Sequence, residues 1–91
     1  MNKSKGNKMT LFLIPIGIAV NFVLGSIITL LEADAAANKL TITMLLDDVL
    51  VLSQDAGVQT IVTSVKTLIE TDAVTNAATA VTLLRSIETL L

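Results

Sequence analysis

One continuous apolar run lies near the N-terminus, and two less regular patterns follow it. Residues 11–31, LFLIPIGIAVNFVLGSIITLL, contain no ionisable side chain. As a helix at ~1.5 Å per residue, this run is about 31 Å long, close to the ~30 Å hydrocarbon core of a bilayer. A buried helix of a soluble protein is the rival interpretation, but the rest of the chain is short for covering every side of it. The run therefore predicts a transmembrane helix.

A cleaved signal peptide is the main alternative for this run. The apolar region of a signal peptide usually spans about 7–15 residues, so the length favours an uncleaved anchor. Against that, the segment Ala33-Asp34-Ala35 has the small-x-small form of a cleavage site. In both cases Lys3, Lys5 and Lys8 precede the run and predict a cytoplasmic N-terminus, with residues 36–91 outside.

The next segment, residues 40–53 (LTITMLLDDVLVLS), is ambiguous between strand and helix. Leu40, Ile42 and Met44 alternate with threonines as in a half-buried strand, and Asp47-Asp48 would suit a turn. Because an isolated two-stranded hairpin is marginally stable in water, we expect a second buried helix here.

The C-terminal segment has a helical period. After a break at residues 54–57, where Gly57 is suited to a positive φ, hydroxyl side chains recur every three or four residues. Asp72 interrupts the pattern and is a good N-cap for a new helix, so we expect an antiparallel pair of helices, 58–70 and 73–91. One unbroken rod is the rival. The hydroxyl residues are Thr60, Thr63, Thr67, Thr71, Thr75, Thr79, Thr82, Ser86 and Thr89.

An aliphatic stripe lies opposite the hydroxyl stripe and predicts a packing face. On the apolar run, Gly17, Asn21 and Gly25 recur every four residues, a spacing that lets membrane helices approach closely. Lys66–Glu70 and Arg85–Glu88 are spaced for ion pairs along one helix. The residues expected to pack against other helices are Gly17, Asn21, Gly25, Val58, Ile61, Val62, Val65, Leu68, Ile69, Leu84, Ile87 and Leu91.

Composition argues against catalysis and metal binding. The chain has neither His nor Cys, which removes the commonest general base and the commonest soft metal ligands. We therefore assign no catalytic, cofactor-binding or metal-binding residue. The basic N-terminal head is followed by an acidic remainder, which argues against nucleic acid as a partner.

One part of the chain resembles a known family. Residues 14–31, IPIGIAVNFVLGSIITLL, are similar to the first membrane helix of the substrate-binding (S) components of energy-coupling factor transporters. The resemblance covers about a fifth of the chain and implies a bundle of about six membrane helices. This chain has one clear span, and no vitamin-binding position of the family has a match in it, so none is assigned.

Together these patterns predict an all-α protein with one N-terminal transmembrane helix and two or three amphipathic helices after it. The expected divisions are a basic cytoplasmic head (1–10), the span (11–31), a juncture (32–39) and an acidic outer segment (40–91). The expected function is helix–helix association in or at the membrane lipid, with a second copy or a larger membrane protein. The alternatives are a secreted or surface-assembly peptide released near Ala35, and a fragment or relative of a transporter component.

Overall fold

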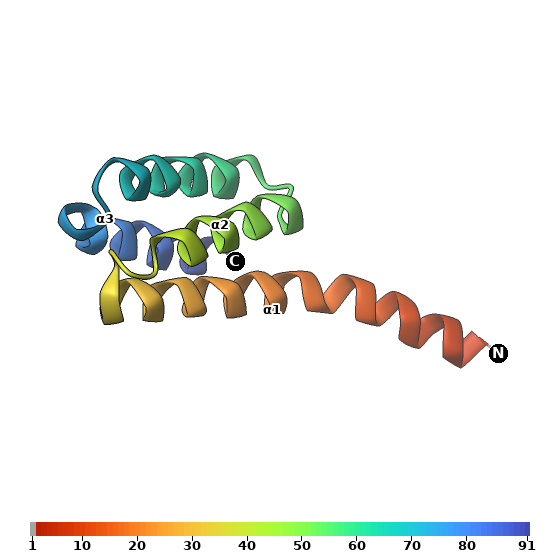
Figure 1. Ribbon diagram of the computed structural model, residues 1–91. Helices are drawn as coiled ribbons and strands as arrows, with labels where there is room; N and C mark the ends of the chain where they lie inside the picture. Colours follow the sequence, from red (N-terminus) through yellow and green to blue (C-terminus); the bar gives the residue numbers. More distant parts are fainter. Residues whose placement is uncertain (1) are drawn as a thin grey trace.

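The chain is all-α, as the sequence predicts. The computed structural model describes the backbone of residues 2–91 and the side chains of residues 17–91. It contains three helices, α1 (Asn2–Asp34), α2 (Lys39–Leu52) and α3 (Ala56–Leu90) (Figure 1), and no strand in the described part. The helix expected over residues 40–53 is confirmed by α2, and the strand alternative is wrong. Its alternating residues belong to a helix that buries Ile42, Leu46 and Val49, spaced four and three apart.

The third helix is divided at Asp72. This residue has φ −162° and ψ 97°, an extended conformation inside an otherwise helical run. Its side chain accepts a hydrogen bond from the backbone N–H of Thr75, so it acts as the N-cap of a new helix. The predicted break is therefore confirmed, and the continuous rod is wrong. We call the two parts the first half of α3 (56–71) and the second half of α3 (73–90).

The connection between α2 and α3 does not depend on a positive φ at Gly57, as the sequence had suggested. No glycine in the described residues has a positive φ, and Gly57 lies in the first turn of α3. Residues 53–55 make the connection instead, with extended backbone at Ser53 (φ −105°, ψ 126°) and at Asp55 (φ −70°, ψ 124°). The Asp55 carboxylate caps α3 by accepting from the Val58 N–H at 3.0 Å.

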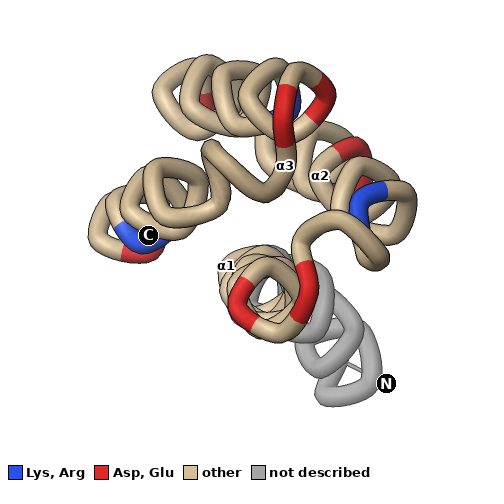
Figure 2. The backbone as a smooth tube through the Cα atoms, turned by 60° about the vertical axis from the view of Figure 1, so that its left-hand side comes forward, with Lys and Arg blue, Asp and Glu red and all other residues tan. Residues whose placement is uncertain are grey.

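Four helical segments pack as an up-and-down bundle. Successive segments run in opposite directions (Figure 1), and seen along their axes α1, α2 and the two halves of α3 surround one centre (Figure 2). Each segment turns one aliphatic stripe inward, so all four contribute to a single core. The buried apolar residues are Val20, Leu24, Ile27, Ile28, Leu31, Ala35, Ile42, Leu46, Val49, Val58, Val62, Val65, Ile69, Ala73, Ala80, Leu84 and Ile87.

The bundle consists of two similar helical hairpins. Hairpin 1 comprises residues 17–52, and hairpin 2 comprises α3. At an offset of 38, every buried apolar residue except Ile28 has a buried apolar counterpart, for example Leu24 with Val62 and Leu46 with Leu84. Residues 17–53 and 55–91 are also identical at 12 of 37 positions. The identical pairs are 20/58, 26/64, 29/67, 30/68, 32/70, 34/72, 35/73, 38/76, 41/79, 45/83, 46/84 and 52/90.

Candidate helix-packing interface

The two hairpins turn their corners with the same side-chain hydrogen bonds. At the first corner, Asp34 Oδ1 accepts from the Ala37 N–H at 3.0 Å, and the Asn38 amide donates to the Leu30 carbonyl at 3.0 Å. Both bonds join side chains of the corner to backbone groups at the end of α1 and in the turn that follows it. The chain reverses direction here within the few residues between α1 and α2.

The second corner repeats this arrangement 38 residues later. Asp72 Oδ1 accepts from the Thr75 N–H at 3.1 Å, and the Asn76 amide donates to the Leu68 carbonyl at 2.9 Å. The Thr75 hydroxyl adds a bond to Asp72 Oδ2 at 2.9 Å. These bonds from Thr75 lower the pKa of the Asp72 carboxyl group below its usual value, because they stabilise the ionised form.

Two ion pairs join one hairpin to the other. Lys66 Nζ in the first half of α3 lies 2.8 Å from Asp47 Oδ1 in α2. Arg85 in the second half of α3 lies 3.8 Å from Glu32 in α1. The expected partners Glu70 and Glu88 are not used for these pairs, because the neighbouring helices bring carboxylates of hairpin 1 to the two cations. Both pairs are solvent-accessible, so they contribute more to the choice of partner surface than to stability.

Hydrogen bonding and attraction to Asp47 raise the pKa of Lys66 above its usual value.

A third contact between the hairpins comes from Lys39 at the start of α2. Its ammonium group donates to the Glu70 carbonyl at 3.3 Å, near the C-terminal end of the first half of α3. A cation at this end of a helix is favourable, because the unpaired carbonyls carry partial negative charge.

Most of the residues expected on the packing stripe lie in the core. Val58, Val62, Val65, Ile69, Leu84 and Ile87 are buried, and Ile61 and Leu68 are half-buried. The stripe ends before Leu91, which is 52% exposed. These residues contact other helices of the same chain, and contact with a second molecule stays a prediction.

The small-residue positions of α1 lie outside the core. Gly17 and Asn21 are exposed, and Gly25 is half-buried. A Cβ atom added at Gly17 or at Gly25 would meet no neighbouring group within 4 Å. No segment of the described chain packs closely against either glycine, so the docking of another helix there also stays a prediction.

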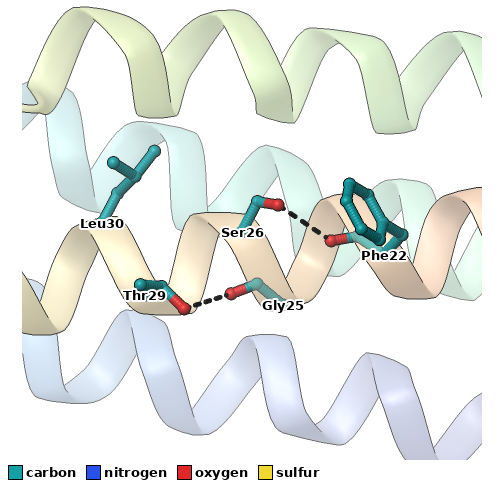
Figure 3. A pocket seen from close by; sticks show the side chains of 5 residues that line it. All are labelled: Phe22, Gly25, Ser26, Thr29 and Leu30. Carbon is teal, nitrogen blue, oxygen red and sulfur yellow. Dashed lines mark hydrogen bonds between the residues drawn. The ribbon is translucent and has the colours of Figure 1, made fainter.

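The outward side of α1 is uncharged and carries a shallow depression (Figure 3). Ile18 is 63% exposed and Phe22 is 75% exposed. The hydroxyls beside them are satisfied within the helix, since Ser26 donates to the Phe22 carbonyl at 3.1 Å and Thr29 to the Gly25 carbonyl at 2.9 Å. This side of α1 therefore presents few polar hydrogens that require water.

The hydroxyl stripe of α3 has the same internal bonding. Thr60, Thr63, Thr67 and Thr71 each donate to the carbonyl four residues earlier, at distances of 2.8–3.1 Å. Thr82, Ser86 and Thr89 do so in the second half of the helix. The stripe is an exposed helix face, and seven of its nine hydroxyl groups donate back to the backbone.

No chemical site emerges from the described residues. Among residues whose placement is described, no group of three or more His, Cys, Asp or Glu side chains could hold a metal ion. One segment, Gly17–Asp34 of α1, is long and apolar enough to cross a bilayer, with a mean hydropathy of 1.5. Of the residues in that segment 28% are buried in the bundle, and Ile18 and Phe22 are the large apolar side chains that it exposes.

Comparisons with protein-family models, curated proteins and solved structures find no match to this chain.

The feature that the sequence patterns above did not reveal is the repeat between the hairpins. Its signal is present in the segments LLEADAAAN (30–38) and LIETDAVTN (68–76), which agree at five of nine positions. Comparing the chain with itself at an offset of 38 would have found both corners.

Proposed function

We propose that this chain is a small membrane-associated helical protein that acts by helix–helix association. The observation that carries the proposal is the pair of large apolar side chains, Ile18 and Phe22, that the uncharged segment 17–31 of α1 exposes on the outside of the bundle. Contact with lipid would remove the exposed Ile18 and Phe22 side chains from water, which is favourable for apolar surface. The internally bonded hydroxyls of Ser26 and Thr29 lower the cost of that transfer.

The basic head strengthens attachment to an anionic surface. Lys3, Lys5 and Lys8 precede the apolar run without an intervening acid, and their side chains lie outside those that the structure describes. Each lysine near an anionic leaflet contributes about 1 kcal/mol of attraction, and salt screens it. We therefore propose binding that is stronger on anionic than on neutral vesicles, with α1 as the attached element.

Attachment and a full span make different demands on the bundle. A 21-residue span over 11–31 would take Val20, Leu24, Ile27 and Leu31 out of the core that the other helices cover. Attachment through the outward side of α1 leaves those residues in place. We propose the attached form, in which the bundle of residues 17–91 stays folded at the membrane surface and supplies the association surface.

Vesicle flotation with matched variants tests the attachment. Phe22→Asp places a charge on the outward side of α1 without entering the core, and it should move the protein from the floating to the unbound fraction. Val74→Asp is the control, because Val74 is a similarly exposed apolar residue, 65% exposed, on a different helix, α3. Equal flotation of the two variants would contradict attachment through α1.

Release by cleavage after Ala35 is the alternative from a different class, and the core argues against it. Such a cut would remove Val20, Leu24, Ile27, Ile28 and Leu31, which are all buried. The remaining segment 36–91 would keep three helices with one side of their core open. The mass of the protein recovered from cells decides between the two: a chain that retains α1 supports attachment, and one that begins near Ala36 supports release.

A further inference from the structure

We propose that the partner in association is a second copy of this chain, and that two copies exchange hairpins. In such a dimer, hairpin 1 of each copy packs on hairpin 2 of the other copy, through the contacts that join the two hairpins within one chain. The proposal names the partner for the association part of the proposed function and does not depend on the attachment to lipid.

The repeat is the first reason. Both hairpins present the same inward stripe, with buried residues at eight matched positions between 20/58 and 49/87. Because the two stripes are equivalent, hairpin 1 of one copy can cover hairpin 2 of another copy as it covers its own. Reciprocal exchange closes at two copies and leaves no inward stripe uncovered.

The charges select which hairpins pair. Asp47 and Arg85 occupy equivalent positions in the repeat, as do Glu32 and Glu70. When hairpin 1 pairs with hairpin 2, Asp47 meets Lys66 and Arg85 meets Glu32. Both contacts are attractive, whether they form within one chain or between two.

Pairs of identical hairpins are disfavoured by the same positions. Two copies of hairpin 1 would bring Asp47 to the Glu32 of the other copy, which are like charges. Two copies of hairpin 2 would bring Arg85 to Lys66 as well as to Glu70, so one contact repels. Repulsion of this kind disfavours the pairing of identical hairpins, and of two copies of hairpin 1 most, relative to the association of hairpin 1 with hairpin 2.

The connection between the hairpins allows exchange. Only residues 53–55 separate α2 from α3, and both Ser53 and Asp55 already have extended backbone angles. The local bonds at this connection, such as Gln59 Nε2 to the Ser53 carbonyl at 3.0 Å, join residues close in sequence and do not lock one hairpin onto the other. Rotation about this short hinge moves hairpin 2 away as a unit and exposes both inward faces to a second copy.

Cysteine cross-linking tests the exchange, because the natural chain contains no cysteine. Two full-length chains with different tags, one carrying Asp47→Cys and the other Lys66→Cys, are co-expressed and treated with a short bis-maleimide. Exchange brings the thiol at position 47 of one chain beside the thiol at position 66 of the other. We expect cross-linked heterodimers at several times the yield obtained when Asp48→Cys replaces Asp47→Cys, since the next residue is rotated by about 100° on the helix.

A chain carrying both Asp47→Cys and Lys66→Cys verifies the fold, because the bundle predicts a cross-link within that chain. Heterodimers no more abundant than in the Asp48→Cys control, while this double variant closes its internal cross-link, would overturn exchange. The reaction is run with and without vesicles. Loss of flotation with cross-linking intact contradicts only the attachment, and loss of cross-linking with flotation intact contradicts only the exchange.

Charge complementation provides a second measurement. A chain with Asp47→Lys repels its own Lys66, and a chain with Lys66→Asp repels its own Asp47. In a mixed exchanged dimer, the two substituted side chains face each other and the two natural ones do the same, so both contacts join opposite charges. Size-exclusion chromatography should show several-fold more dimer in the mixture than in either chain alone, and an equal amount in all three would contradict the proposal.

Discussion

Asn38 and Asn76 make the same hydrogen bond, each to the backbone carbonyl eight residues before it. The distances are 3.0 Å to Leu30 and 2.9 Å to Leu68. Each amide thus ties the start of a returning helix to the end of the preceding one. A carbonyl oxygen can accept two hydrogen bonds, so each asparagine adds a side-chain bond near the end of the preceding helix.

Replacement of either asparagine by alanine should therefore destabilise the bundle to a similar extent. Loss of one partly buried hydrogen bond costs about 1 kcal/mol. Asn38→Ala and Asn76→Ala should each lower the free energy of unfolding by about that amount in urea titrations followed by circular dichroism. Asn21→Ala, at an exposed position of α1, is the control and should change it by less than about 0.5 kcal/mol. A large effect at one corner alone would contradict the equivalence of the two corners.

The core positions of the two hairpins should also respond alike. Leu46 and Leu84 are 38 residues apart, and each is fully buried. Truncation of a buried leucine to alanine costs about 2–5 kcal/mol, because it removes apolar contacts and leaves a cavity. Leu46→Ala and Leu84→Ala should each show a loss in this range or fail to fold. Leu40→Ala, which changes a side chain 74% exposed on α2, should unfold close to the natural chain. Comparable losses at Leu40 and Leu46 would show that α2 has a different inward face.

Acidification should lower the stability of the corner at Asp72, where the two halves of α3 meet. Because the pKa of Asp72 is lower in the folded chain than in the unfolded chain, the carboxylate stabilises the fold at pH values above about 4. That stabilisation is lost as the pH falls through the folded pKa. Thr75→Val removes the hydroxyl donor, so the pKa of Asp72 should rise toward its usual value in an NMR titration. Thr71→Val, whose hydroxyl donates to the Thr67 carbonyl, should leave the titration unchanged.

A substitution at Gly25 should change the stability of the monomer and its association in opposite directions. The position lies within α1, and a Cβ atom there meets no group within 4 Å. Gly25→Ala should stabilise the isolated bundle by about 0.5–1 kcal/mol, because alanine loses less backbone freedom in a helix. If the stripe of Gly17, Asn21 and Gly25 packs against a partner helix, the same variant should reduce association while it raises the stability of the monomer. Association that is unchanged would argue against that stripe as a contact surface.

The sequence predicted the helices well where their period was clear. The hydroxyl period defined α3, and the capping chemistry of Asp72 located its break. The strand-like alternation at Leu40, Ile42 and Met44 was misleading, because so short a window cannot distinguish a strand from a helix whose other positions are also apolar. Gly57 was misleading as well, since residues 53–55 form the connection with ordinary extended angles.

The position of α1 in the bundle did not follow from the apolar pattern alone. Its run is apolar on every side, so the residues that face the core cannot be distinguished by their hydrophobicity. The repeat supplies the missing information, since Val20 and Leu24 correspond to Val58 and Val62 of an amphipathic helix. The ion-pair partners of Lys66 and Arg85 could not be predicted from the sequence either, because they lie on other helices and depend on how the hairpins pack.

Hydrogen–deuterium exchange on the natural chain, with and without anionic vesicles, tests the central claim most directly. Val58, Val62 and Val65 pack in the same core as the stripe of α1, so their amides report whether α1 stays in the bundle. We expect the slow exchange of residues 58–69 to be unchanged when vesicles bind, while α1 exchanges no faster. Loss of protection in 58–69 on vesicle binding, with α1 still protected, would show that α1 leaves the core to span the bilayer and would contradict the account.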